Sequence, residues 1–156
     1  MNAPRDPRYC TFHLDDLYLG VPVTSVQEVI RFQERTRVPL VSPVIHGLIN
    51  LRGEIVTTVD LRHRLQLPPR PDDHEPINVV VRHHDGVVSL LVDEIGDVFH
   101  VPDDDFDPLP PTLDGVYRDF VHGIHKLDDR LLLILDTDRL LDLPDITEQL
   151  TESLTT

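Results

Sequence analysis

Histidine is the first side chain to consider for chemistry, because the 156-residue chain contains nine. His46, His122 and His125, with aspartates nearby in the chain, could hold a metal ion or support catalysis in a small β-barrel. The spacings HExxH, CxxC and HxxxH are all absent from the sequence. His83 and His84 are adjacent, so on a strand they would point to opposite faces. We therefore expect no metal site and no cofactor, and the His/Asp barrel is kept as the alternative.

A nucleophilic or phosphate-transferring active site is not indicated either. The sequence contains no GxSxG, P-loop or GxGxxG. The single cysteine, Cys10, excludes an intrachain disulfide and lies in an alternating apolar run, which predicts a core thiol. We assign no catalytic residue, and the sequence favours an interaction domain over an enzyme.

Glu28 is a candidate helix-capping carboxylate. Apolar residues at helical spacing predict a short helix from Val23 to about Phe32. Ser25-x-x-Glu28 then has the form of a capping box, in which Glu28 reaches back to the amide of Ser25. Arg52 is most simply a solvated turn residue.

Arg52 belongs to a predicted β-hairpin. The β-rich run Gly47–Leu51 is followed by the turn-prone pair Arg52-Gly53 and a second run, Ile55–Val59. Asp60 comes directly after the second run, where extended chain gives way to a short helix, and it is a natural N-cap. The sequence therefore predicts strand, turn, strand and capped helix in this order.

The same succession of strand, turn, strand and capped helix recurs 76 residues later in the chain. Four residues of the first copy meet identical residues in the second: His46, Gly47, Leu51 and Asp60 correspond to His122, Gly123, Leu127 and Asp136. Two copies are too few for a solenoid. We expect Gly47–Leu65 and Gly123–Leu141 to be equivalent parts of two packed lobes, with Asp136 as the second cap.

The remainder of the chain also predicts short strands. Hairpins are expected over Tyr9–Val21 and Ile77–Val92, the latter with an Asp-Gly turn. Fourteen prolines argue against long helices, and the clearest linker is Pro68–Asp73. This pattern predicts an all-β fold made of barrels or a sandwich.

The net charge of −14 limits the classes of partner. It repels nucleic-acid phosphates and anionic lipid headgroups, so we expect no nucleic-acid partner. No stretch approaches 18 consecutive apolar residues and the N-terminus lacks an apolar signal region, so we expect no direct membrane insertion. With one cysteine, a reducing compartment is the default.

Several of these segments, in this order, resemble the CheW domain family, the coupling proteins of bacterial chemotaxis. The resemblance rests on Val26–Ile30, then Gly47–Gly53, then Val59–Arg62, in which Asn-Leu-Arg-Gly is followed seven residues later by Asp-Leu-Arg. The Val92-Asp93 turn and the strand Leu132–Asp136 fit as well. The match covers roughly residues 9 to 143.

The resemblance implies an all-β fold of two packed five-stranded SH3-like β-barrel subdomains with short helices. It implies a single domain over residues 9–143, with a lobe boundary near 66–76 and terminal segments able to cross between the lobes. Residues 1–8 would form a flexible leader, and residues 144–156 a C-terminal tail or short helix.

The resemblance also implies a non-enzymatic scaffold. Its partners would be the regulatory domain of a CheA-type histidine kinase, the cytoplasmic tip of chemoreceptors, and other CheW-like domains. The helical receptor tip would pack in a groove between the barrels. The protein would be cytoplasmic and recruited to membrane receptor arrays through these partners. An adaptor of a non-flagellar chemosensory system is a further alternative.

Eight positions match the family's receptor-contacting and kinase-coupling residues: Val26, Glu28, Gly47, Ile49, Asn50, Leu51, Arg52 and Gly53. Among them we expect Val26 to line the receptor groove with Ile49 or Leu51. The resemblance also places the segment of Glu28 beside the turn of Arg52, which favours their pairing.

Overall fold

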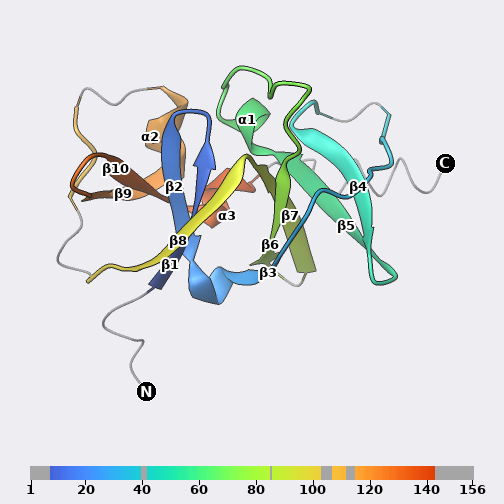
Figure 1. The fold of residues 1–156 in the computed structure, drawn as a ribbon, viewed down its shortest axis with the longest axis horizontal. Helices are drawn as coiled ribbons and strands as arrows, with labels where there is room; N and C mark the ends of the chain where they lie inside the picture. Colours follow the sequence, from blue (N-terminus) through green and yellow to red (C-terminus); the bar gives the residue numbers. More distant parts are fainter. Residues whose placement is uncertain (1–7, 40–41, 85, 103–106, 112–114, 143–156) are drawn as a thin grey trace.

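The computed structural model describes residues 8–39, 42–84, 86–102, 107–111 and 115–142 (Figure 1). The expected leader, apart from its last residue, and the expected C-terminal tail lie outside these ranges. Within them, no helix is long and apolar enough to cross a membrane.

Ten strands form two five-stranded sheets. The first sheet has the order β8 (Glu94–His100), β1 (Arg8–Leu14), β2 (Leu17–Pro22), β10 (Leu131–Leu135) and β9 (Val121–Lys126). The second has the order β3 (Val26–Ile30), β6 (Ile77–His83), β7 (Gly86–Val92), β5 (Glu54–Asp60) and β4 (Ile45–Leu51). The predictions of an all-β fold and of the hairpins are confirmed.

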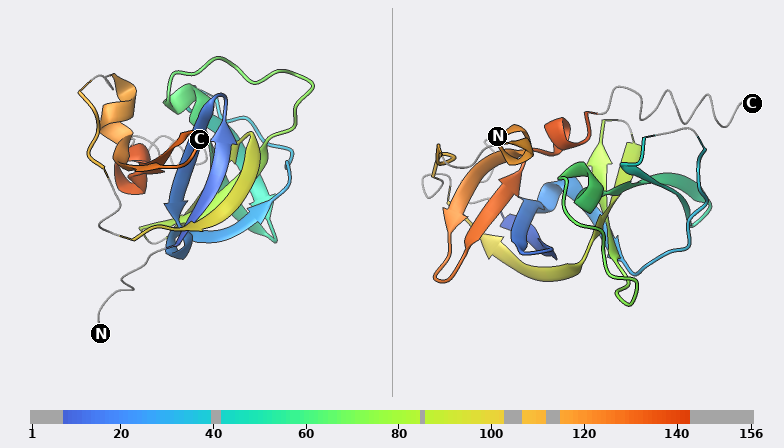
Figure 2. Two further views of the ribbon diagram at one scale, coloured as in Figure 1. Left: turned by 60° about the vertical axis from the view of Figure 1, so that its left-hand side comes forward. Right: turned by 90° about the horizontal axis from the view of Figure 1, so that it is seen from above.

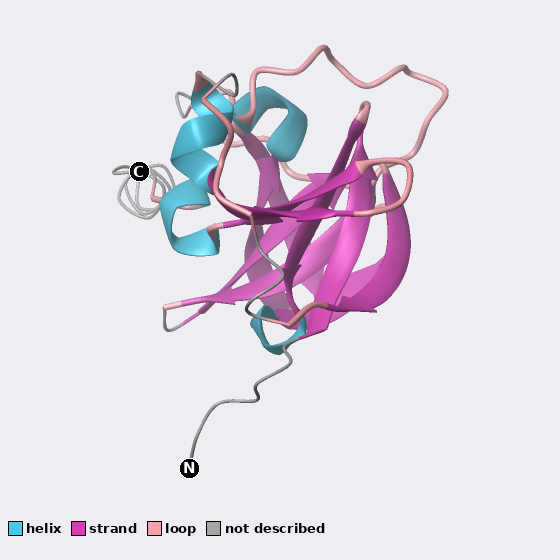
Figure 3. Ribbon diagram, turned by 90° about the vertical axis from the view of Figure 1, so that its left-hand side faces the viewer, coloured by secondary structure: helices cyan, strands magenta, loops and turns pink. Residues whose placement is uncertain are grey.

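Four short helical segments complete the described part of the chain. They are the 3₁₀ turn η1 (Val23–Ser25) and the helices α1 (Leu61–Arg64), α2 (Val116–Phe120) and α3 (Thr137–Leu140). Figure 3 shows the three α-helices on one side of the strands and η1 at the other.

Each sheet combines strands from both halves of the chain: the first joins the β1–β2 hairpin to β8, β9 and β10, and the second joins the β6–β7 hairpin to β3, β4 and β5. After the β1–β2 hairpin the chain passes into β3, which pairs antiparallel with β6 of the second sheet. After the β6–β7 hairpin it passes into β8, which pairs antiparallel with β1 of the first sheet (Figure 2). The two lobes therefore exchange strands, which joins them more firmly than a single linker would.

The 76-residue repeat occupies equivalent places in the two sheets. The β4–β5 hairpin with α1 lies in the second sheet, and the β9–β10 hairpin with α3 lies in the first. The amide of Asp60 donates to the carbonyl of Val44 at 2.8 Å, and the amide of Asp136 donates to that of Phe120 at 2.8 Å. Each aspartate side chain also accepts amide hydrogen bonds from the helix that follows it.

The larger hydrophobic core is shared by both sheets. Phe12 and Leu19 of the first sheet belong to it together with Val79 and Leu90 of the second, all with at most 1% of their surface exposed. A smaller core lies within the first sheet around Tyr18. Because one core serves both sheets, the lobes fold as a single unit.

The predicted helix from Val23 to Phe32 is wrong. Only Val23–Ser25 is helical, as a 3₁₀ turn, and β3 follows at once. Along β3 the exposure alternates with period two, and Gln27 and Val29 are the exposed residues. Pairing with β6 supplies partners for the backbone of these β-branched residues and outweighs the helical spacing of the valines. The capping-box interpretation of Glu28 is therefore wrong as well.

Candidate functional site

The β4–β5 turn presents Arg52 to solvent. Leu51 and Glu54 form the last pair of the hairpin, and the two turn residues between them, Arg52 and Gly53, have φ angles of 54° and 89°. Both values are positive, which is typical of the tight hairpin turns that match strand twist. The side-chain oxygen of Asn50 accepts a hydrogen bond from the amide of Gly53 at 2.8 Å and so fixes the turn.

Arg52 makes a bidentate ion pair with Glu28. Its Nη2 lies 2.7 Å from Oε1 and its Nη1 lies 2.8 Å from Oε2. The Arg52 side chain is 74% exposed, whereas that of Glu28 is 17% exposed. The hydrogen bond from Arg52 lowers the pKa of Glu28, so the carboxylate is ionised over the physiological range.

This ion pair joins the two edges of the second sheet. Glu28 belongs to β3 at one edge, and Arg52 follows β4 at the other. Strands that are far apart in the sheet order are thereby linked, and the sheet is closed into a barrel at this end. The position of the turn relative to β3 is therefore set by a planar, charge-assisted contact.

Gly47 allows a second link between the same edges. A Cβ added at Gly47 would lie 2.6 Å from the carbonyl oxygen of Thr36, in the segment that follows β3. Thr36 and Leu48 exchange two backbone hydrogen bonds of 2.8 Å. Only glycine permits this close approach, so Gly47 serves the architecture of the site.

The remaining predicted residues differ in what they offer a partner. Ile49 is 2% exposed, so it supports its neighbours from inside the barrel. Val26 is half-buried and packs against the larger core, and Leu51 is also half-buried. Of the eight predicted positions, Asn50, Arg52 and Gly53 are the exposed ones.

Two exposed apolar residues of the same elements escaped the sequence reasoning. Val29 is 44% exposed and follows Glu28 in β3. Ile55 is 58% exposed and pairs with Asn50 across the β4–β5 hairpin. A β-branched residue two positions after a hairpin turn is a signal that could have identified Ile55. The polar site is therefore accompanied by apolar surface.

A buried carboxylate, Asp93, ties three segments together. It accepts hydrogen bonds from Arg62 Nη2 at 2.5 Å, Arg70 Nε at 2.9 Å and the Asp15 amide at 2.7 Å. Burial by itself would raise the pKa of Asp93, but these hydrogen bonds outweigh it and lower the pKa to about 2. The β1–β2 turn of the first sheet is thus held to α1 and to the linker before β6.

The three histidines of the metal-site alternative do not converge. His46 lies on β4 in the second sheet, whereas His122 and His125 lie on β9 in the first. In the described part of the chain, no group of three or more His, Cys, Asp or Glu residues could hold a metal ion. These three histidines are therefore not gathered at one site.

Comparison with known proteins gives consistent matches. A family model described as the CheW-like domain matches residues 8–145. The chain is 37% identical over 126 residues to the chemotaxis protein CheW of Bacillus subtilis (strain 168), covering 79% of each chain. It is 28% identical over 134 residues to the chemotaxis protein CheW of Helicobacter pylori, covering 86% of this chain and 81% of that protein.

A solved structure gives the corresponding match in three dimensions. The crystal structure of the scaffolding protein TtCheW from Thermoanaerobacter tengcongensis superposes with a TM-score of 0.79 at 27% sequence identity. The match covers 88% of this chain and 94% of that chain. The likeness therefore extends over both sheets.

Proposed function

Because the chain belongs to the CheW-like domain family, we propose that it is a chemotaxis coupling adaptor that links chemoreceptors to a CheA-type histidine kinase. The role requires no catalysis, since the adaptor acts by holding two partners in one assembly. Its two five-stranded SH3-like lobes share a core, so a contact at one lobe has a fixed position relative to the other.

The observation that carries this proposal at the level of residues is the Glu28–Arg52 pair. The pair fixes the exposed turn against β3 through two short hydrogen bonds. A partner that meets Arg52 therefore meets a surface already held in place, and little conformational entropy is lost on binding. We assign to this surface the coupling of receptor and kinase.

The proposed receptor contact is apolar. A helical receptor tip binds by laying apolar residues into a cleft, and the chain's net charge of −14 favours local apolar contacts over bulk attraction. Val26 and Leu51, which are half-buried, and the exposed Val29 are the candidates on this chain, whereas Ile49 is 2% exposed and faces the interior. The kinase regulatory domain and further CheW-like domains would complete the array at the membrane.

Charge reversal tests the role of the ion pair. Glu28→Arg and Arg52→Glu should each weaken assembly of receptor, adaptor and kinase, and the double reversal should partly restore it. Co-sedimentation of the three purified components measures this, and the double-mutant cycle isolates the pairwise coupling. A coupling energy indistinguishable from zero would remove the pair from the coupling mechanism.

Aspartate substitution tests the apolar contact. Val26→Asp should abolish receptor binding, because it places a charge in the proposed contact. Val26 also packs against the core, so Val29→Asp, at a more exposed position, is made alongside it. Circular dichroism checks that both variants are folded. Folded variants that still assemble normally with receptor would rule out this part of β3 as the receptor site.

A further inference from the structure

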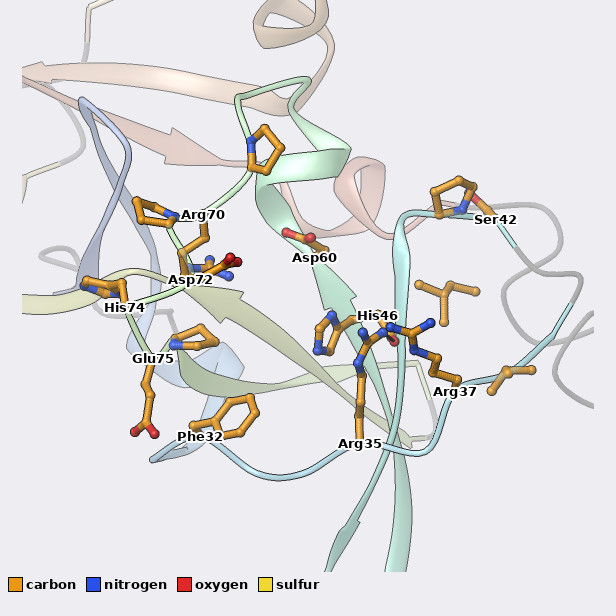
Figure 4. Close-up of a pocket in the computed structure, with 16 residues that line it drawn as sticks. Phe32, Arg35, Arg37, Ser42, His46, Asp60, Arg70, Asp72, His74 and Glu75 are labelled. Atoms are coloured by element: carbon orange, nitrogen blue, oxygen red, sulfur yellow. Dashed lines mark hydrogen bonds between the residues drawn. The ribbon is translucent and has the colours of Figure 1, made fainter.

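A pocket of about 850 Å³ opens on the lobe of the second sheet (Figure 4). It lies between the segment that joins β3 to β4, the start of α1, and the linker that leads to β6. Three arginines line it, Arg35, Arg37 and Arg70, and Phe32 and Pro76 contribute apolar wall. The pocket does not contain Glu28 or Arg52, so it is distinct from the proposed coupling surface.

Two of these arginines lack a carboxylate partner within the described part of the chain. Arg35 Nη1 donates to the main-chain carbonyl of His46, which is a neutral acceptor. Arg37 is exposed and makes no ion pair with any described residue. Figure 4 shows both guanidinium groups beside the His46 ring. Two positive charges are therefore held close together, and the carboxylate of Asp60 partly compensates that of Arg35.

The electrostatics around His46 agree with this geometry. The pKa of His46 is lowered to about 4, mainly by burial of the ring and next by the positive charge of Arg35, so the ring is neutral at pH 7. Asp60 acts in the opposite direction, but its carboxylate accepts amide hydrogen bonds at the start of α1. The other acidic residues of the lining, Asp72 and Glu75, are exposed on the linker.

Arg70 adds a third positive charge with spare donor capacity. Its Nε donates to Asp93, yet the same carboxylate also binds Arg62, so one negative charge serves two guanidinium groups. The Nη2 of Arg70 is buried and has no hydrogen-bond partner in the described structure. A buried donor without an acceptor costs free energy, and a shift of this side chain toward a ligand oxygen in the pocket would recover it.

We propose that this pocket binds the phosphate group of a small organic phosphate. Arg35 and Arg37 would hold the phosphate oxygens, since planar guanidinium groups match phosphate geometry, and Arg70 would supply a further donor. Phe32 and Pro76 would contact the apolar body of the ligand. The volume falls within the range of small-molecule pockets and exceeds what an inorganic ion needs.

Isothermal titration calorimetry at fixed ionic strength tests the proposal with three probes. Phenyl phosphate should bind saturably and more tightly than inorganic phosphate, because only the former has an apolar body. Benzoate should bind most weakly, because it has one charge and two oxygens. Arg37→Gln should weaken phenyl phosphate binding about tenfold, the loss expected when a charge-assisted hydrogen bond is removed.

Arg8→Gln is the matched control, because it removes the same charge from β1, outside the pocket lining. It should leave the affinity for phenyl phosphate unchanged. Equal weakening by both substitutions, or no saturable binding of phenyl phosphate, would overturn the proposal. Equal affinities for the two phosphates would refute the apolar subsite. The result is independent of the adaptor role, because receptor and kinase are absent from the assay.

Discussion

Asp93→Asn tests whether one buried carboxylate holds the two lobes in register. The substitution keeps the shape of the side chain and removes its charge. It leaves Arg62 and Arg70, whose side chains are 9% and 11% exposed, without a carboxylate. The Asp15 amide of the first sheet loses a charged acceptor as well. The variant should therefore be less stable than the parent protein.

The size of the loss follows from the pKa of Asp93. The pKa falls from 3.8 to about 2 on folding, and one pKa unit corresponds to about 1.4 kcal/mol, which gives about 2 kcal/mol at neutral pH. Removing one partner of a buried ion pair costs about 3–5 kcal/mol in general, and this figure counts the same contacts that lower the pKa, so the two values are not added. We expect the free energy of unfolding at pH 7 to fall by about 2–5 kcal/mol.

The destabilisation caused by Asp93→Asn should be largest near neutral pH and should decrease as the pH falls. The carboxylate has a lower pKa in the folded state, so its contribution is fully present above the unfolded value of 3.8 and is lost as the pH falls through about 2. Urea unfolding of both proteins across this range measures the difference in their free energies of unfolding. That difference should shrink as Asp93 becomes protonated in the parent protein.

Asp16→Asn is the control, since Asp16 is exposed in the same β1–β2 turn region. It should change stability little at any pH. The reasoning is refuted if Asp93→Asn unfolds at the same urea concentration as the parent, or if the stability gap at pH 7 persists undiminished near pH 2.

Three further outcomes are expected. Gly47→Ala should destabilise the protein by about 1–3 kcal/mol in urea unfolding, because its Cβ would lie 2.6 Å from the Thr36 carbonyl oxygen. Gly86→Ala is the control and should be nearly neutral, because its Cβ would enter open space. Equal destabilisation by the two substitutions would contradict this. Asp60→Ala and Asp136→Ala should each lower the free energy of unfolding by about 1 kcal/mol, because each removes a helix cap. The two losses should be additive in the double variant, since the caps lie in different lobes. Strong non-additivity would argue against separate roles. Elemental analysis of the purified protein should find no stoichiometric transition metal, and zinc retained after chelation would favour the metal-binding alternative.

The local structure of the hairpin turns and helix caps was predicted from the sequence. The turn at Arg52-Gly53, the cap at Asp60 and their recurrence at Asp136 depend on residues within a few positions of one another. Backbone angles and amide hydrogen bonds within one hairpin are set mainly by those neighbours. For this reason the hairpins and the all-β class were predicted correctly.

Only the tertiary structure decided what the segment Val26–Ile30 becomes and which group Glu28 meets. Helical spacing and β-branched composition gave opposing signals there, and pairing with β6, some 50 residues away, selected the strand. The same dependence on distant residues explains why the cluster around Asp93 was missed. Sequence shows which side chains could form ion pairs, but long-range strand pairing determines which of them come within hydrogen-bonding distance.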